Sequence, residues 1–348
     1  MRTIDLRSDT VTLPTPAMRK AMYEAELGDD VYGEDPTVNR LEALVAEKLG
    51  KEAGLLVVSG TMGNLTALMA HAQRGDEVIM GHLAHTYLYE AGGISVLGGV
   101  HVRTVPNLPN GMLNPADVEL AVRDPNNIHF PRSRVVCLEN THNRCGGAVL
   151  SPAQMATVRE VAQRHGLMVH LDGARIFNAA VALGIDASEI AAQVDSVQLC
   201  FSKGLSAPVG SAVVGSADYI KEVRRQRKIV GGAMRQAGII AAAAIVALEE
   251  MVDRLAEDHE NAQVLAQGIK EIDGLDVDLD SVQSDIIMIT LTASDVEITD
   301  LVKAFRAEGL MINNIDASHF RAVTHYGIER EDISEALAIL SRVMKQVA

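Results

Sequence analysis

The chain has 348 residues and a net charge of −15, with 48% hydrophobic and 22% charged residues. This composition is typical of a folded globular protein and excludes a disordered chain. A surface this acidic repels nucleic-acid phosphates and anionic lipids, so we expect neither nucleic acid nor a membrane as a partner. Aromatic residues make up only 3% and tryptophan is absent, so stacking platforms for bases or sugars cannot be numerous.

No export or membrane signal is visible. Charged residues are spread through the first ten positions, which excludes the apolar core of a signal peptide there. The longest apolar run, 237–248, is shorter than the roughly 20 residues of a membrane span. The cysteines Cys137, Cys145 and Cys200 are too few and too scattered for a disulfide framework and suit a reducing compartment. We therefore expect a cytoplasmic protein.

Short apolar runs alternate with helix-length segments over the first two thirds of the chain. A helix is expected over 152–165, with Ser151 as its N-cap and Pro152 as its first residue. The alternation predicts an α/β fold with a mostly parallel, doubly wound central sheet in a large domain, residues 1–248, that includes an N-terminal arm. The expected strands are 55–58, 77–80, 134–138, 167–171, 196–200 and 212–214.

The pattern changes after residue 248. A long, charged, periodic helix is expected over 249–272, followed by shorter strands at 285–291 and 310–313. A closing helix is expected from Asp332 onward. These elements predict a smaller α+β domain, residues 249–348, joined to the large domain through the long helix.

A lysine and an aspartate follow neighbouring strands of the expected sheet. Asp172 comes directly after one apolar run and Lys203 directly after the next. Because parallel strands joined by one crossover end on the same edge, both side chains can reach one crevice. Pyridoxal phosphate needs this pair, since a lysine binds it as a Schiff base and a carboxylate keeps its ring nitrogen protonated. The alternative is a simple ion pair at a strand edge, which is commoner among proteins in general.

A glycine-containing turn could hold the phosphate. Gly60 and Thr61 lie where an apolar run gives way to a helix, so backbone N–H groups and a hydroxyl can bind a dianion there. The turn is neither a P-loop nor a dinucleotide fingerprint. An ordinary strand-to-helix turn is the alternative.

Two histidines follow the second expected strand. His82 and His85 could stack on a cofactor ring, and an imidazole also works as an acid or base near neutral pH. Their spacing of three also fits zinc. No third ligand follows at a suitable distance, so we predict no metal site.

Arginine is the side chain that binds a substrate carboxylate in bidentate fashion. Arg175 follows Asp172, and Arg321 lies on an expected strand of the small domain, so a substrate could lie between the domains. Singly, each could equally be a surface ion-pair residue. A basic cluster, 221–228, is followed by two glycines and Arg235. It could face a local anion or an acidic surface of a neighbouring subunit, although such charge runs are usually solvated faces.

Taken together, these motifs resemble the low-specificity L-threonine aldolases. The resemblance covers nearly the whole chain in order. It implies dependence on pyridoxal phosphate, fold type I (the aspartate aminotransferase-like fold), and a homotetramer whose active sites are completed across subunits. The matching segments are 5–12, 29–33, 139–143, 172–175, 202–204 and 321–325.

The resemblance also implies roles for single residues. Lys203 binds the cofactor and Asp172 pairs with its ring nitrogen, while His85 stacks on the ring. The chain departs from the family after Asn143, where 144–149 replaces the usual Gly-Lys-Val. The phosphate would be bound by Gly60 and Thr61, and the substrate carboxylate by Ser8, Arg175 and Arg321. His129 would lie near the substrate hydroxyl, and Tyr89 would line the pocket. The positions implied to reach the site of a neighbouring subunit are Tyr32, Lys228 and Arg235, and the further candidates for binding the cofactor are Arg175, Lys228 and Arg235.

The implied reaction is retro-aldol cleavage of L-threonine, L-allo-threonine and related β-hydroxy-α-amino acids to glycine and an aldehyde. His85 or His129 would take the hydroxyl proton. Serine hydroxymethyltransferase-like, transaminase and racemase activities remain alternatives with the same cofactor. A catalytically silent binding protein of the same fold is a further alternative.

Overall fold

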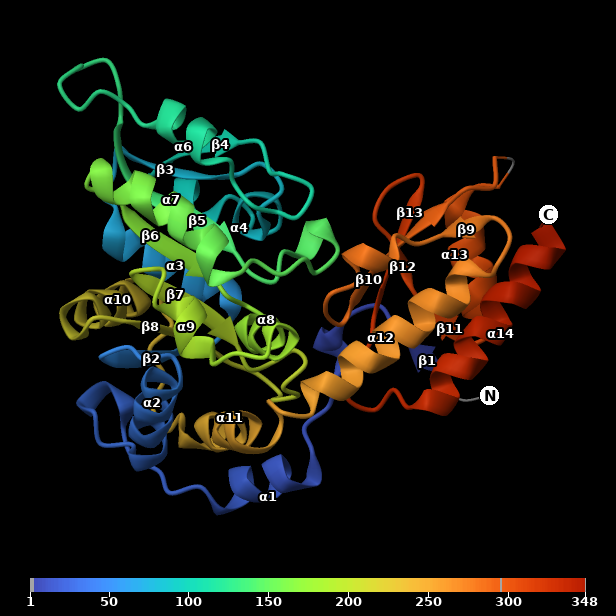
Figure 1. Ribbon diagram of the computed structural model, residues 1–348. Helices are drawn as coiled ribbons and strands as arrows, with labels where there is room; N and C mark the ends of the chain where they lie inside the picture. The colour runs from blue at the N-terminus through green and yellow to red at the C-terminus, as the bar shows by residue number, and fades with distance from the viewer. Residues whose placement is uncertain (1–2, 295, 348) are drawn as a thin grey trace.

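The computed structural model describes residues 3–294 and 296–347, which form two groups of secondary structure (Figure 1). The larger group is built on a seven-stranded sheet of order β2-β8-β7-β6-β5-β3-β4. Strand β8 is antiparallel to both of its neighbours, and the other pairs are parallel. The strands are β2 (Ala53–Val57), β3 (Asp76–Gly81), β4 (His101–Val105), β5 (Arg132–Glu139), β6 (Met168–Asp172), β7 (Ser196–Cys200) and β8 (Ser211–Gly215).

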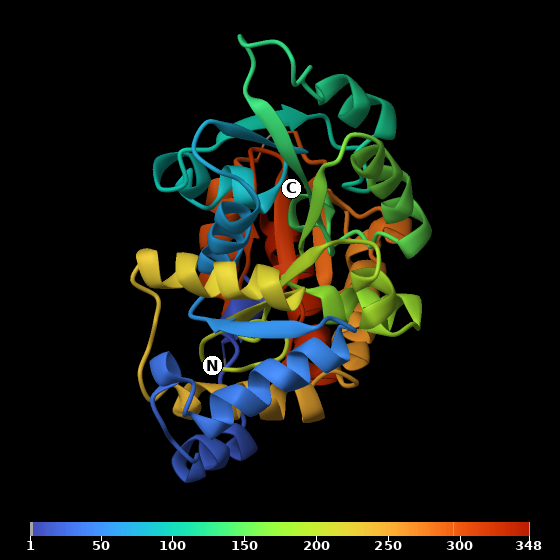
Figure 2. The same ribbon diagram turned by 90° about the vertical axis from the view of Figure 1, so that its left-hand side faces the viewer.

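Helices cover both faces of this sheet, which explains the continuous apolar runs of its strands. Helix α3 contacts β7 and β8, and α10 contacts β2, whereas α7 contacts β6. Figure 2 shows α3 and α10 on one side of the sheet and the green helices on the other. The helices of this group are α1 (Pro16–Glu24), α2 (Pro36–Lys48), α3 (Gly60–His71), α4 (His85–Leu88), α5 (Gly93–Val96), α6 (Pro115–Ala121), α7 (Pro152–Arg164), α8 (Ile176–Leu183), α9 (Ala187–Ala191), α10 (Ala217–Ile229) and α11 (Gly238–Glu250).

The six strands predicted for the first domain are all present, and the fold class is confirmed. Helix α7 begins at Pro152 as predicted, and Ser151 caps it through a reciprocal capping box with Gln154. Strand β4 was missed because it is an exposed edge strand with polar residues such as His101 and Thr104.

The single long helix predicted for 249–272 is wrong. The chain forms α11, which ends at Glu250, and a separate helix α12 (Leu255–Lys270). Helix α11 packs against α1 and α2 in the larger group, while α12 packs against α14 (Arg330–Val347) in the smaller one. Because helical structure is interrupted between them, the two helices can pack in different groups of the fold.

The smaller group holds a four-stranded antiparallel sheet of order β12-β13-β10-β9 and three helices. Ile4 and Leu6 also belong to its core, because β1 (Ile4–Asp5) pairs in parallel with β11 (Leu310–Met311). The N-terminal arm therefore crosses from one group to the other, and the division at residue 248 remains a prediction. The other elements are α12, α13 (Ile298–Ala307), α14, β9 (Leu275–Asp276), β10 (Ile286–Leu291), β12 (Asn313–Asn314) and β13 (His319–Val323).

The carboxyl ends of the parallel strands face the smaller group. A cavity between the two groups is lined by His85 and Asn143, which follow β3 and β5, and by Met288 and Arg321 of β10 and β13. Among residues 3–294 and 296–347, no helix combines the length and apolarity needed to cross a lipid bilayer.

Candidate active site

Lys203 and Asp172 line the same cavity, of about 130 Å³. Strands β6 and β7 are paired in parallel, with Asp172 opposite Gln198. Asp172 is the last residue of β6, and Lys203 follows the end of β7. The adjacent, parallel strands thus bring an amine and a carboxylate to one crevice, as the spacing predicted.

The start of helix α3 forms another wall of this cavity, through Gly60 and Thr61. Ser59 caps the helix by accepting a hydrogen bond from the backbone N–H of Met62. A Cβ atom at Gly60 would lie 2.8 Å from Sγ of Cys200, so only glycine allows this close approach. The helix N-terminus with its free N–H groups is suited to a phosphate.

Asp172 is held in place by three hydrogen bonds. It is 2% exposed. Its Oδ2 accepts from Nδ2 of Asn64 at 2.9 Å and from the hydroxyl of Thr86 at 3.5 Å, and its Oδ1 accepts from the backbone N–H of Ala174 at 3.2 Å. A buried carboxyl group fixed in place by these donors is suited to bind the ring nitrogen of the cofactor.

Asn64 links Asp172 to a second buried acid, Glu90. Its Nδ2 also donates to Oε1 of Glu90 at 2.9 Å, and the same Glu90 oxygen lies 3.0 Å from Nδ1 of His85. The Asn64 carbonyl faces Nε2 of His170 at 3.1 Å. Burial lowers the pKa of His170 to about 3, so this imidazole is neutral and fixes the orientation of the amide.

The sequence-based predictions did not include Asn64 and Glu90. Asn64 lies one helical turn after Gly60, on the same face of α3, and that spacing was the available signal. Ligand atoms of His85, Glu90 and Asp172 lie within 4.8 Å of one another, as in a metal site. Because the Asn64 amide donates to both carboxylates, hydrogen bonds account for this cluster.

Arg175 has a different partner from the substrate carboxylate predicted for it. Its Nε and Nη2 donate to the two oxygens of Asp9 at 2.8 and 2.7 Å, and both side chains are buried. Burial alone would raise the pKa of Asp9, but the Arg175 guanidinium lowers it to about 2. This edge of Arg175 is therefore already occupied by a carboxylate of the same chain. Ser8, predicted for the same role, precedes Asp9 and accepts hydrogen bonds from Thr10.

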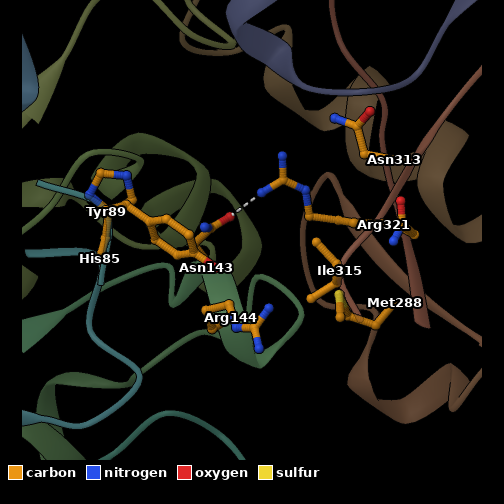
Figure 3. Close-up of a pocket in the computed structure, with 9 residues that line it drawn as sticks. His85, Tyr89, Asn143, Arg144, Met288, Asn313, Ile315 and Arg321 are labelled. Atoms are coloured by element: carbon orange, nitrogen blue, oxygen red, sulfur yellow. Dashed lines mark hydrogen bonds between the residues drawn. The ribbon is translucent and has the colours of Figure 1, made fainter. Parts of the chain in front are cut away.

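Arg321 lines the larger, interdomain cavity, of about 470 Å³ (Figure 3). Its Nη1 donates to Oδ1 of Asn143 at 2.7 Å and its Nη2 to the carbonyl of Arg7 at 3.1 Å. Its Nε is buried and has no hydrogen-bond partner among the described residues. His85 and Tyr89 line this cavity too, and His85 is shared with the cavity of Lys203. Arg321 thus lies at the wall of the cavity where a substrate could lie, with its two terminal nitrogens anchored by other residues of the chain.

His129 does not reach the site of its own chain. It is exposed in the loop before β5, whereas the site lies beyond Glu139 at the other end of that strand. At about 3.3 Å per residue the two ends are roughly 25 Å apart. The predicted role of His129 near the substrate hydroxyl therefore requires a neighbouring subunit and remains a prediction.

Three further predicted residues lie at the surface, away from the described lining of the Lys203 cavity. Tyr32 is 75% exposed. Lys228 lies near the end of α10, and Arg235 forms an exposed ion pair of 3.0 Å with Asp29. Their expected contact with a neighbouring subunit remains a prediction.

The fold and the paired lysine and aspartate define a fold type I enzyme of the pyridoxal-phosphate-dependent class. Residues 5–292 match the beta-eliminating lyase family. The chain is 45% identical to low-specificity L-threonine aldolase 1 of Arabidopsis thaliana, covering 99% of this chain and 97% of that protein. It is 44% identical to low specificity L-threonine aldolase of Escherichia coli, covering 96% and 97%. A solved threonine aldolase from Leishmania major superposes with a TM-score of 0.83 at 21% identity, over 97% and 98% of the two chains. The chain therefore belongs to the low-specificity L-threonine aldolases of the beta-eliminating lyase family.

Proposed function

We propose that the protein uses pyridoxal phosphate to cleave L-threonine, L-allo-threonine and related β-hydroxy-α-amino acids to glycine and an aldehyde. The observation that carries this proposal is the cavity shared by Lys203, Asp172 and the start of α3. It offers an amine, a buried carboxylate and a helix N-terminus, which are the three groups that this cofactor requires. The high identity to full-length aldolases supports the same activity.

The described residues fit the cofactor. Lys203 would bind its aldehyde carbon, Asp172 its ring nitrogen, and Gly60 and Thr61 its phosphate. His85, which lines the same cavity, would stack on the ring. When bound, the cofactor supplies an electron sink for the electron pair left on Cα after the Cα–Cβ bond breaks.

Substrate binding and proton transfer fall to side chains of the two cavities. Arg321, a guanidinium at the wall of the larger cavity, would bind the α-carboxylate. His85 lines both cavities and keeps Nε2 available, because Nδ1 is engaged by Glu90. Its Nε2 would take the proton of the β-hydroxyl. His129 can play this part only if another subunit brings it to the cavity.

We also propose a homotetramer with shared sites, to which Tyr32, Lys228 and Arg235 contribute from a neighbouring subunit. Their surface positions support this proposal. Light scattering after gel filtration measures the assembly. Three free cysteines favour a reducing, cytoplasmic compartment, which cell fractionation tests. In that setting the enzyme would degrade threonine and form glycine.

One assay tests the proposed reaction. The purified protein loaded with pyridoxal phosphate is incubated with L-threonine or L-allo-threonine, and glycine and acetaldehyde are measured together. Equal amounts of the two products are expected. An oxo acid would indicate a transaminase, interconversion of stereoisomers at Cα a racemase, and folate-dependent turnover a serine hydroxymethyltransferase. No product and no cofactor spectrum would indicate a silent binding protein.

A further inference from the structure

The interdomain cavity is much larger than threonine requires. Its volume of about 470 Å³ lies in the range of pockets for drug-sized ligands, roughly 300–1,000 Å³. His85, the base in the proposed function, lies at its boundary with the cofactor cavity. On that proposed function, this space is available to the substituent on Cβ, and a methyl group would leave most of it unfilled.

The charge of this cavity is opposite to that of the protein. Of the nine described residues that line it, two are arginines, Arg144 and Arg321, one is His85, and none is acidic. The chain as a whole carries a net charge of −15. Two guanidinium groups in one cavity without a lining carboxylate favour a ligand with two negative groups.

The two arginines are placed for different tasks. Arg321 is anchored by Asn143 and by the carbonyl of Arg7 at the wall of the cavity. Arg144 follows Asn143 in a turn and extends toward the side of the cavity where Ile315 and Met288 lie (Figure 3). Arg144 can therefore meet a group at the far end of a substrate whose α-carboxylate is bound by Arg321.

The turn that carries Arg144 is held by hydrogen bonds to both the larger and the smaller group of secondary structure. The backbone N–H of Asn143 donates to Oε1 of Glu139 at 2.9 Å. Gly147 accepts a hydrogen bond from Ser284 at 2.8 Å, and a Cβ atom at Gly147, whose φ is +70°, would lie 2.5 Å from that hydroxyl oxygen. A fixed backbone lowers the entropic cost of placing the Arg144 side chain on a ligand.

We propose that Arg144 forms a subsite for an anionic β-substituent, so that the enzyme prefers β-hydroxy-α-amino acids whose side chain ends in a carboxylate. This inference rests on the proposed function. In the reaction the Cα–Cβ bond breaks, the hydroxyl proton passes to His85, and Cα gains a proton. The products are glycine and a carboxylate-bearing aldehyde or oxo acid, and no oxidant or reductant is needed.

Two matched substrate pairs test the subsite. Threonine is compared with 3-hydroxyaspartate, and phenylserine with 4-carboxyphenylserine, each in both L-diastereomers. Within at least one pair we expect the anionic member to have a kcat/KM about tenfold higher, the size of one charge-assisted contact. In Arg144→Gln this ratio should fall toward one, and Arg144→Lys should retain part of it. The matched control is Arg306→Gln, which removes one exposed positive charge of α13 and should keep the wild-type ratio.

The outcomes separate the two proposals. If wild type cleaves threonine but shows no preference for the anionic member of either pair, the Arg144 subsite is refuted and the proposed function stands. A preference that is equally strong in Arg144→Gln also refutes the subsite. If wild type cleaves none of the four substrates, the proposed function fails and the subsite fails with it.

Discussion

Oε1 of Glu90 lies 3.0 Å from Nδ1 of His85, in a buried position that also receives the Asn64 amide. Burial raises the pKa of Glu90, and the nearby Asp172 carboxylate adds to this effect. Burial alone would lower the pKa of His85, but the hydrogen bond with Glu90 and the charge of Asp172 raise it above its ordinary value. The contact with Glu90 engages Nδ1, so Nε2 is the ring nitrogen left for the substrate.

Glu90→Gln should weaken catalysis and change its pH dependence. An amide of the same shape cannot supply the charge that raises the pKa of His85, so this pKa should fall. His85 would then stay neutral to lower pH, and the acid limb of the kcat/KM profile should move to lower pH. A loss of about 10- to 100-fold in kcat is expected for a positioning residue of this kind. The measurement is the pH profile of threonine cleavage.

The control for Glu90→Gln is Glu335→Gln, which removes an exposed acid of α14. It should leave the profile unchanged. A Glu90→Gln enzyme with a lower kcat but an unmoved acid limb would mean that Glu90 only packs against His85 and does not set its protonation.

Asp172→Asn should abolish most of the turnover while the fold is kept. The amide has the shape of the carboxylate but cannot hold a protonated ring nitrogen, and it meets the Asn64 amide as donor against donor. We expect kcat to fall on the order of 10³-fold, as for loss of a main electrostatic group. Turnover is measured alongside circular dichroism and cofactor content. Near-normal activity in a cofactor-loaded variant would contradict the role of Asp172.

Lys203→Ala should remove the Schiff-base absorbance of the bound cofactor. Lys203 lines the cavity together with Asp172, and its amine is the group expected to bind the aldehyde carbon. Absorbance spectra after dialysis measure this. Lys221→Ala, which removes an exposed amine of α10, should keep the wild-type spectrum. A band that survives dialysis in Lys203→Ala would place the cofactor elsewhere.

The part of the site that local pattern determines was predictable from the sequence. Asp172 and Lys203 follow apolar runs, and parallel pairing of those runs brings them together. Glu90 was not predictable in this way, because it lies in an irregular segment after α4 and its burial arises only when α3 packs beside it. The pairing of Arg175 with Asp9 joins residues far apart in the chain, and no local pattern reports such a contact.

The domain arrangement also combines parts that a local sequence pattern predicts with contacts between distant segments that it does not. The apolar pattern predicted the inner strands of the large sheet, since strands such as β7 and β8 are buried on both faces. It could not show that Ile4 and Leu6 complete the other core. Two short strands, β1 and β11, make that connection. Strands of two residues are too short to show the alternation of apolar and polar side chains by which a strand is recognised in a sequence.

Asp285 is a buried carboxylate that should make stability fall as the pH rises. Both of its oxygens lack a hydrogen-bond partner among the described residues, and Arg175 is 3.9 Å away. Burial raises the pKa of Asp285 to about 7. The nearby carboxylates of Asp9 and Asp258 also raise this pKa, whereas the positive charge of Arg175 lowers it. The folded state thus keeps a proton that the unfolded state releases above the ordinary aspartate pKa of 3.8.

The sign of the effect follows from proton binding. Between about pH 4 and about pH 7 the folded state binds more protons at Asp285 than the unfolded state does. The stabilisation from protonated Asp285 is therefore complete below about pH 4 and is lost as the pH rises to about 7. Asp285→Asn removes the titration and should flatten this part of the stability curve. The Tm of the variant minus the Tm of wild type should therefore be larger at pH 8 than at pH 5. Each 1 kcal/mol of difference in the free energy of unfolding corresponds to roughly 2–4 °C.

Asp285→Ala separates the charge from the packing. It leaves a cavity, so it should lower Tm at both pH values, but its change between pH 5 and pH 8 should match that of Asp285→Asn. Asp9 does not mask the effect, because its lowered pKa, about 2, confines its own loss of stability to more acidic pH. If both variants keep the wild-type difference in Tm between pH 5 and pH 8, Asp285 is ionised throughout that range and its charge is balanced by Arg175.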